Sequence, residues 1–253
     1  MNHKKQKTRP GSLPRALAIL DGVTGGADTL KSLTAHTGMA SSTVHRILAL
    51  LVDEGLLVQL GRTYRLSARL IELGEHARRN YPLKEVAAEP MRELSRATRE
   101  TVHLGVLDGT DIIYLEKISG DRGLQMASYV GLRSPAQTTA MGKALIANLP
   151  EDRWPHYFQP LKPRTPNSIT TRGDFLAELA AVREEGCAFD REENEVGVRC
   201  VAAAVTGSAG LPQTAVSLSG ATIYIDEARQ LELVPYVRAC AADIATRISG
   251  SAR

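Results

Sequence analysis

Residues 41–55 constrain the fold more than any other segment of the chain. The apolar residues of this segment recur at i, i+3, i+4 and i+7, namely Val44, Ile47, Leu48 and Leu51. This spacing predicts a single apolar stripe along a helix, so the opposite face must be polar and exposed. Ser41 or Ser42 is the expected N-cap of this helix, and Gly55 is its expected end.

The neighbouring segments complete a small helical unit. A helix over about residues 14–23 precedes a second one that begins at Asp28 or Thr29 and ends at Gly38. After the amphipathic helix, two short strands are predicted around Gly61-Arg62. Helices, a tight turn and a hairpin in this order are typical of a winged helix-turn-helix domain.

This order suggests how the N-terminal part of the chain is organised. We expect a winged helix-turn-helix, DNA-binding domain over residues 13–66. A disordered basic arm over residues 1–12 is expected before it, and a linker helix over residues 67–80 after it. The remaining residues, 81–253, then form a second domain.

The charge distribution favours a nucleic-acid partner for the N-terminal part. Residues 1–80 contain 12 basic and 6 acidic side chains, whereas residues 81–253 contain 19 basic and 22 acidic ones. The formal charge of +3 for the whole chain conceals this asymmetry. A net charge of +6 on a small helical unit is typical of modules that bind phosphates.

In the helix-turn-helix geometry, the N-terminal part of the second helix of the pair enters the major groove of double-stranded DNA. The first helix, the polar face of the amphipathic helix and the hairpin supply the expected contacts, namely Arg15, Ser41, Ser42, Thr43, His45, Arg46, Arg62 and Tyr64. Their hydroxyl, imidazole and guanidinium groups can reach phosphates or base edges. Taken singly, each residue also fits a cap, a turn or a solvated position, and only the combination favours DNA binding.

Residues 81–253 predict an α+β domain rather than a doubly wound sheet. Two strands, 102–107 and 112–118, alternate around Asp108-Gly109, which is a strong hairpin signal. The other expected strands cover residues 124–129, 187–191, 198–205 and 213–219. The expected helices cover residues 83–98, 139–149, 173–185 and 226–248.

The composition is unlike that of membrane-spanning, secreted or disulfide-rich proteins. No apolar run approaches the length of a membrane span, and the basic start has no apolar stretch behind it that would make a signal peptide. The three cysteines, Cys187, Cys200 and Cys240, form no CxxC and indicate a reducing compartment. We therefore expect a cytoplasmic protein with no membrane association, no cofactor and no metal ion.

Several separated motifs together resemble the IclR (isocitrate-lyase regulator) family of transcription factors. The N-terminal motifs are residues 15–20, 42–48 and 54–56. The later motifs are residues 100–104, 131–135, 140–145 and 190–202. The resemblance covers about residues 13–248, and it implies that residues 81–253 form a GAF-like effector-binding domain, an antiparallel sheet flanked by helices.

The resemblance also implies that this domain binds a small organic acid, either an aromatic or a short aliphatic carboxylate. The positions that match effector contacts of the family are Met126, Ser134, Ala140, Met141, Asp190, Cys200, Ser217 and Ser219. The residues agree with such a role, because a helix that begins after Thr139 directs its first N–H groups at the preceding loop and can bind a carboxylate. Ser217 and Ser219, two apart on one strand, share a face.

Some positions leave alternatives open. Met141 stands where members that bind very short keto acids have a small residue, so it either faces the pocket or points elsewhere. Arg133 and Lys143 are the cations near the expected anion site, and a solvated surface position suits both equally well. Cys200 also fits as a small buried hydrophobic residue.

Two other classes of function compete with a ligand-responsive regulator. An architectural DNA-binding protein would have no effector. An enzyme would need Cys200 as nucleophile with His103 or His156 as base, yet no nucleophile-elbow, P-loop or dinucleotide motif is present. We therefore expect a regulator rather than an enzyme, and the sequence leaves open whether it represses or activates.

The expected assembly is a homodimer on two DNA half-sites, with pairing of dimers into a tetramer left open. Contact between the two N-terminal domains is expected from the first helix and from the linker helix, whose apolar residues exceed what one domain of this size needs to bury. In the linker these are Leu70, Ile71, Leu73 and Ala77.

Overall fold

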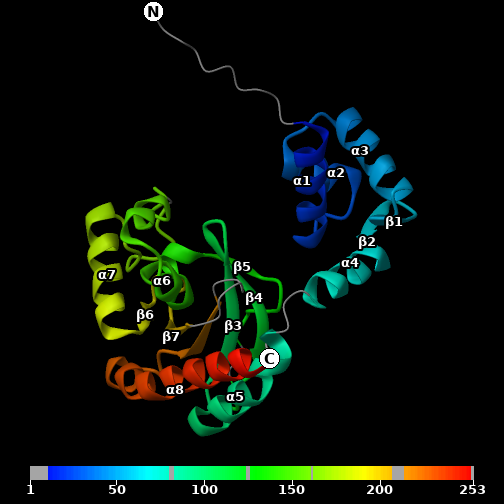
Figure 1. Ribbon diagram of the computed structural model, residues 1–253. Helices are drawn as coiled ribbons and strands as arrows, with labels where there is room; N and C mark the ends of the chain where they lie inside the picture. The colour runs from blue at the N-terminus through cyan, green and yellow to red at the C-terminus, as the bar shows by residue number, and fades with distance from the viewer. Residues whose placement is uncertain (1–10, 80–82, 124–125, 161, 207–213, 252–253) are drawn as a thin grey trace, which may run out of the picture. The chain divides into compact units, whose positions relative to one another are not determined.

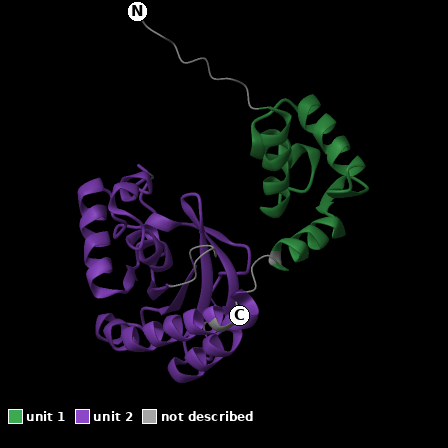
Figure 2. Cartoon of the chain, in the orientation of Figure 1, with its two compact units in different colours: residues 1–81 green, residues 82–253 purple. Residues whose placement is uncertain are grey.

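The computed structural model describes residues 11–79, 83–123, 126–160, 162–206 and 214–251. The chain divides into two compact units, residues 1–81 and residues 82–253, called here the N-terminal and C-terminal units (Figure 2). Residues 1–10 of the predicted basic arm lie outside the described residues. In the described part of the chain, no helix combines the length and the apolar character needed to cross a membrane.

The N-terminal unit has the element order of a winged helix-turn-helix (Figure 1). Its elements are α1 (Ser12–Thr24), α2 (Leu30–Thr37), α3 (Ser41–Asp53), β1 (Leu57–Leu60), β2 (Thr63–Leu66) and α4 (Ala68–Arg79). The antiparallel pairing places Leu60 opposite Thr63, so Gly61 and Arg62 form the turn of the wing. Gly61 has a φ of 61°, a conformation that glycine adopts without steric cost.

Local signals explain where α2 begins and ends. The Thr29 hydroxyl accepts a hydrogen bond from the Ser32 N–H at 3.2 Å, and the Ser32 hydroxyl accepts one from the Thr29 N–H at 3.0 Å. This reciprocal capping satisfies two N–H groups that the helix leaves unpaired. Gly38, at a φ of 64°, ends the helix in the left-handed conformation.

The predicted N-cap of α3 is wrong. Ala40 is the N-cap, and no side chain caps the helix. The helix starts one residue earlier than a serine cap would allow, because the N–H groups of Thr43 and Val44 both bond to the Ala40 carbonyl. Ser41 and Ser42 therefore lie in the first turn, exposed to solvent.

The predicted stripe of α3 forms the centre of the N-terminal core. All four of its residues are at most 4 % exposed. They pack against Ile19 of α1, Leu33 of α2, Leu57 of β1 and Tyr64 of β2. Packing of one amphipathic face against four other elements stabilises helices that would be marginal alone.

The C-terminal unit is an antiparallel sheet with helices on both faces. Its helical elements are α5 (Leu83–Thr98), η1 (Ala136–Thr138), α6 (Ala140–Ala147), η2 (Glu151–His156), α7 (Arg172–Glu185) and α8 (Glu227–Ser251). Its strands are β3 (Thr101–Asp108), β4 (Asp111–Ile118), β5 (Arg133–Pro135), β6 (Ala188–Arg191), β7 (Val198–Val205) and β8 (Thr214–Ala221). The strand order is β5-β4-β3-β8-β7-β6.

Alternation along the strands divides the core of this unit in two. On β7, Val201, Ala203 and Val205 belong to the cluster formed with α5 and α8. Cys200 and Ala202 belong to the cluster formed with α6 and α7, because successive side chains of a strand point to opposite faces. Figure 1 shows α5 and α8 side by side, with α6 and α7 away from them.

The predicted strand over residues 124–129 is wrong in its described part. Residues 126–129 are irregular, and residues 124 and 125 lie outside the described residues. The short strand β5 takes the edge position instead, where Ser134 pairs with Ile112 of β4. The backbone of residues 126–128 is held by Lys117 instead, as described below.

The close approach of α6 to η1 depends on Gly142. A Cβ atom at this position would lie 2.0 Å from the Ala136 carbonyl oxygen, a distance that no backbone adjustment of a few tenths of an ångström relieves. The first turn of α6 therefore needs a glycine at its third residue.

We expect Gly142→Ala to lower the free energy of unfolding by about 2 kcal/mol or more, because the added methyl group clashes with backbone rather than with a movable side chain. Chemical denaturation of the full chain measures this. Gly173→Ala in α7 is the matched control, since a Cβ there has only a 3.9 Å contact. That control should change stability by less than about 1 kcal/mol. Equal stability of both variants would contradict this account of α6.

Candidate functional site

A cavity of about 240 Å³ lies in the C-terminal unit. Its walls come from β3, β4, β5, β7 and β8, the N-terminus of α6, and the segments 126–132 and 190–198. It is lined by all eight residues that were predicted to contact an effector, namely Met126, Ser134, Ala140, Met141, Asp190, Cys200, Ser217 and Ser219. The structure thus brings together residues from distant parts of the chain, and it places Met141 in the cavity wall.

The sheet register explains why the polar strand residues meet. Ser217 of β8 lies opposite His103 of β3, and Ser219 lies opposite Cys200 of β7. Val216 and Leu218, which alternate with these serines, pack on the α5 and α8 side. One face of the sheet therefore builds the apolar core, while the other presents hydroxyl, imidazole and thiol groups to the cavity.

His103 provides a neutral imidazole in the cavity wall. Its Nε2 lies 2.7 Å from the Ser128 hydroxyl and its Nδ1 lies 3.3 Å from the Ser219 hydroxyl. Burial, with a smaller effect from the Lys117 charge, lowers the pKa of His103 to about 3. The ring is therefore uncharged at neutral pH, and one nitrogen donates a hydrogen bond while the other accepts one.

Lys117 of β4 holds the segment beside His103. Its ammonium group donates to the carbonyls of Met126 and Ser128, both at 2.7 Å. These two bonds take the place of a strand ladder in the 126–129 segment. They therefore fix the part of the cavity wall that Met126 and Ser128 form.

The N-terminus of α6 forms another wall. Thr139 is its N-cap, and the Thr139 hydroxyl accepts a hydrogen bond from the Gly142 N–H at 3.1 Å. The N–H groups of Ala140 and Met141, the first two helical residues, have no intrahelical acceptor. Helix N-termini of this kind carry partial positive charge and attract anions.

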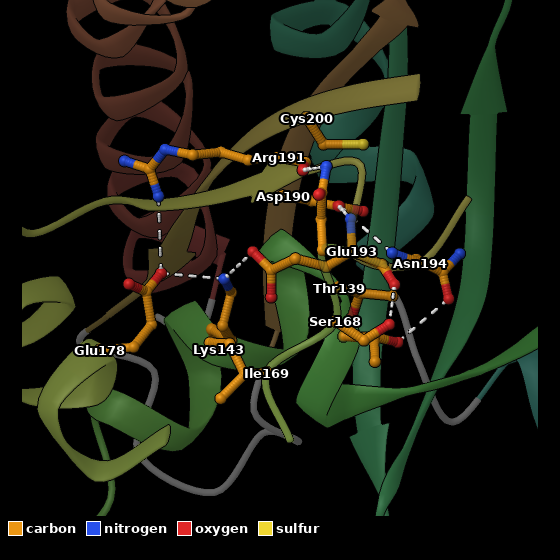
Figure 3. A network of polar contacts seen from close by, with 12 residues as sticks. Thr139, Lys143, Ser168, Ile169, Glu178, Asp190, Arg191, Glu193, Asn194 and Cys200 are labelled. Atoms are coloured by element: carbon orange, nitrogen blue, oxygen red, sulfur yellow. Dashed lines mark hydrogen bonds and ion pairs between the residues drawn. The ribbon is translucent and has the colours of Figure 1, made fainter. Parts of the chain in front are cut away.

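The connection from β6 to β7 covers the cavity and is held by a network of polar contacts (Figure 3). Asp190 Oδ1 accepts from the N–H groups of Glu193 at 2.7 Å and Asn194 at 3.4 Å. The Ser168 hydroxyl donates to the Glu193 carbonyl at 2.7 Å, and the Thr138 hydroxyl donates to the Asn194 side chain at 3.1 Å. The connection is therefore tied to the elements around it.

Lys143 does not occupy the surface position that the sequence allowed. Its side chain is completely buried, and its ammonium lies between Glu193 Oε1 at 2.5 Å and Glu178 Oε1 at 2.8 Å (Figure 3). Lys143 is the fourth residue of α6. Its side chain extends to Glu178 of α7 and to Glu193 of the β6–β7 connection. Two carboxylates already neutralise it, which leaves it no role as a free cation for a ligand.

Arg133 lies at the edge of the cavity and is about half exposed. Its guanidinium donates to Asp108 at 2.7 Å and to Asp111 at 3.3 Å. These pairs raise the pKa of Arg133, with the hydrogen bond to Asp108 as the main cause. Arg133 therefore braces the β3–β4 turn against β5.

The ionisable groups inside the cavity are strongly affected by burial. Burial and the neighbouring Glu193 carboxylate raise the pKa of Asp190 to about 7. Burial and the Asp190 carboxylate raise the pKa of the Cys200 thiol well above its ordinary value. The pKa of Tyr114 is raised for the same main reason. Cys200 and Tyr114 are therefore neutral at neutral pH.

Several cavity residues were missed by the sequence reasoning. They are His103, Tyr114, Ser128, Arg164, Asn194 and Glu195. His103 lies in the 100–104 motif, and its alternation with Val102 and Leu104 could have placed it on the polar face of β3. The others depend on strand pairing and on the folding of connections, for which the sequence contains no local signal.

The predicted DNA contacts lie on three elements of the N-terminal unit. Ser41, Ser42, His45 and Arg46 are exposed on α3, opposite its buried stripe, and Thr43 is half-buried. Arg62 is exposed at the tip of the wing, and Arg15 of α1 is half-buried. This arrangement leaves a polar surface on α3 free of contacts with the core.

Tyr64 is the exception, because it is buried in the N-terminal core at 7 % exposure. Its neighbour Arg65 is exposed on the same strand, as the alternation of β2 requires. The prediction that Tyr64 contacts DNA is incompatible with this burial. The wing offers Arg62 and Arg65 instead.

Comparisons with known proteins agree with this architecture. Residues 75–246 match the family described as "Bacterial transcriptional regulator IclR C-terminal", and residues 12–61 match the "IclR helix-turn-helix domain". The transcriptional regulator KdgR of Escherichia coli is 36 % identical over 223 residues, which cover 87 % of this chain and 85 % of KdgR.

Solved structures show the same fold. The IclR structure from Thermotoga maritima has a TM-score of 0.71 at 29 % identity, over 94 % of this chain and 98 % of that one. An IclR homologue from Microbacterium hydrocarbonoxydans, solved in complex with 4-hydroxybenzoate, has a TM-score of 0.78 at 23 % identity and covers 95 % of this chain and 100 % of its own. At that identity, the second likeness concerns the fold alone.

A helix-turn-helix unit joined to an α+β unit of this kind defines a DNA-binding transcription regulator. The matches to both parts of the chain identify which one: the protein belongs to the IclR family of transcriptional regulators.

Replacement of the buried Lys143 by Met should lower the free energy of unfolding by about 3–5 kcal/mol, because Glu193 and Glu178 then lose their shared cation. Thermal and chemical denaturation measure the loss. Lys162→Met, at an exposed lysine of the same unit, should change stability by less than about 0.5 kcal/mol. A Lys143→Met protein as stable as this control would show that the buried ion pairs are unimportant.

Proposed function

We propose that this regulator acts in the cytoplasm as a homodimer, binds operator DNA through α3 and the wing, and binds a small organic acid in the cavity of the C-terminal unit. The observation that carries the proposal is the cavity itself. Eight residues named from the sequence as effector contacts, spread from Met126 to Ser219, line one cavity. Residues without a shared purpose would not be expected to converge in this way.

The acid's carboxylate binds at the N-terminus of α6. The N–H groups of Ala140 and Met141 are available there, and both residues line the cavity. Ser217, only 2 % exposed, supports this assignment, because its hydroxyl has no hydrogen-bond partner among the described residues. These donors are neutral. Lys143 and Arg133 are both occupied by carboxylates of the protein, and Arg164, at the exposed rim, donates to the Asn194 carbonyl at 2.9 Å.

Binding rather than catalysis suits the chemistry of the cavity. Cys200 would be the nucleophile of an enzyme, but burial raises the pKa of its thiol and keeps it protonated. His103 is engaged with Ser128 and Ser219. The Microbacterium homologue complexed with 4-hydroxybenzoate supports an acid as the ligand of this chain.

Apolar side chains exposed on α1 and α4 support dimer formation through the N-terminal units. Leu13 and Leu17 of α1 are 68 % and 51 % exposed, and Ile71 and Leu73 of α4 are 70 % and 51 % exposed. Large apolar side chains exposed on the surface in this way are typical of protein–protein contacts. A homodimer would present two α3 helices to two half-sites, and further pairing would give a tetramer.

The acid alters operator binding through the linker helix α4, which connects the two units. It does so only if it binds the DNA-bound and DNA-free arrangements with different affinities. The direction of that difference decides whether the acid releases the regulator from DNA or retains it there.

For operator binding, we expect Arg46→Ala to weaken affinity by about 1–3 kcal/mol and to relax specificity at one base position, because Arg46 is exposed in the first half of α3. Fluorescence anisotropy with an operator selected from random duplexes measures both effects. Arg153→Ala removes an exposed charge from the C-terminal unit and should leave affinity unchanged. Unaltered binding by Arg46→Ala would mean that another part of α3 contacts the bases.

For effector binding, we test Ser217→Ala combined with Ser219→Ala. We expect the acid concentration needed for a given rise in Tm to increase by tenfold or more, because each lost hydrogen bond costs about 1 kcal/mol. A thermal-shift screen of aliphatic and aromatic carboxylic acids supplies the acid. Operator affinity without acid should stay at the wild-type value. Ser249→Ala, exposed on α8, is the control. A parallel loss of operator binding would indicate that the two serines serve folding instead.

A further inference from the structure

Of the two carboxyl groups that line the cavity, Glu195 is exposed and Asp190 is buried. Asp190 is 2 % exposed, lines the cavity, and forms no ion pair among the described residues. Its Oδ1 is occupied by the N–H groups of Glu193 and Asn194. Its other oxygen, Oδ2, has no hydrogen-bond partner in the described part of the chain.

No charged group around Asp190 forms an ion pair with it among the described residues, and burial and Glu193 outweigh the Lys143 charge, which lowers its pKa. On the acidic side, Glu193 and Glu195 belong to the same connection. On the basic side, Lys143 of α6 is occupied by Glu193 and Glu178, while Arg133 of β5 and Arg164 lie at the cavity's exposed rim. The remaining titratable neighbours are neutral at neutral pH, namely Tyr114 of β4, His103 of β3 and Cys200 of β7.

An acid bound in the same small cavity adds a second negative charge. Two carboxylates confined in one site of low dielectric constant cannot both remain ionised at low cost, so one of them keeps a proton. The protein's carboxyl is the one that keeps the proton, since Asp190 is buried and its Oδ2 receives no hydrogen bond among the described residues, whereas a ligand carboxylate at α6 receives backbone N–H groups.

We propose that Asp190 is the proton-binding position of the effector cavity, and that it takes up one proton from solvent when an organic acid binds. The inference rests on the proposed effector function and specifies how that site is regulated. The proton forms an O–H bond at Oδ2, the buffer loses that proton, and no other bond changes. The protonated Oδ2 then donates a hydrogen bond into the cavity, where the carboxylate form could only accept one.

A pH dependence of acid binding follows from this. Burial and Glu193 raise the pKa of free Asp190 to about 7, and a bound anion raises it further. Protonation favours binding, so affinity is highest below the free pKa. Above it, affinity falls by up to about tenfold for each pH unit, until the pKa of the complex is reached. Carboxylic acids themselves are fully ionised from pH 6 to 9, so this slope belongs to the protein.

Isothermal titration calorimetry at pH 7.5 in phosphate and in Tris tests the uptake on the wild-type chain, because the two buffers differ in ionisation enthalpy. The probes are acetate, pyruvate, gluconate and 4-hydroxybenzoate. We expect the protein to take up roughly half a proton or more for each molecule of acid that binds. Binding without proton uptake overturns this proposal and leaves the proposed function intact, whereas no binding by any of the four acids overturns both.

Asp190→Asn assigns the proton to its residue. Asparagine keeps the Oδ1 acceptor for Glu193 and Asn194, and its amide group donates where the protonated Oδ2 would. We expect this variant to bind the probes without proton uptake, with constant affinity from pH 6 to 9, and about tenfold or more tightly than wild type at pH 8.5. Asp152→Asn, an exposed acid in η2, should keep the wild-type slope. Weaker binding by Asp190→Asn at pH 8.5, or a retained slope, overturns the assignment.

Discussion

The C-terminal unit depends on one buried cation. Lys143 is fully enclosed, and its ammonium joins three separate parts of the fold: α6, which carries it, the β6–β7 connection through Glu193, and α7 through Glu178. A buried ammonium without its carboxylates would cost several kcal/mol, so these segments keep their places together. Because α6 and the connection are also two walls of the cavity, the same ion pairs fix the shape of the proposed binding site.

The two faces of the sheet in the C-terminal unit have different roles. On β7 and β8, apolar residues such as Val201 and Leu218 face α5 and α8, while Cys200, Ser217 and Ser219 face the cavity. The strand period of two therefore lets one set of strands build a core and line a polar site. The polar face is costly only where a group lacks a partner. The Oδ2 atom of Asp190 has no partner among the described residues, and burial is the main cause of the raised pKa of Asp190.

Much of the fold could be predicted from sequence because its signals are local. The stripe of α3, the Thr29 cap, Gly38 and the Asp108-Gly109 turn act within a few residues. The cavity residues were named through family resemblance, since no spacing rule links Met126 to Ser219. The predictions failed where tertiary contacts decide. Tyr64 is buried in the core, Lys143 is buried between the carboxylates of Glu193 and Glu178, and residues 126–129 are held by Lys117 instead of a strand ladder. Asn194 was missed because loop closure has no local signature, whereas the alternation of His103 with Val102 and Leu104 was a local signal that could have placed it on the polar face of β3.

A regulator of this kind requires that the cavity and the DNA-binding surface influence each other, and thermodynamic linkage makes that influence reciprocal. The most direct test is to measure operator affinity with and without a saturating acid, and acid affinity with and without operator, at one pH and one salt concentration. The account predicts that both affinities change by the same factor. Identical operator affinities in the absence and presence of an acid that demonstrably occupies the cavity would contradict it.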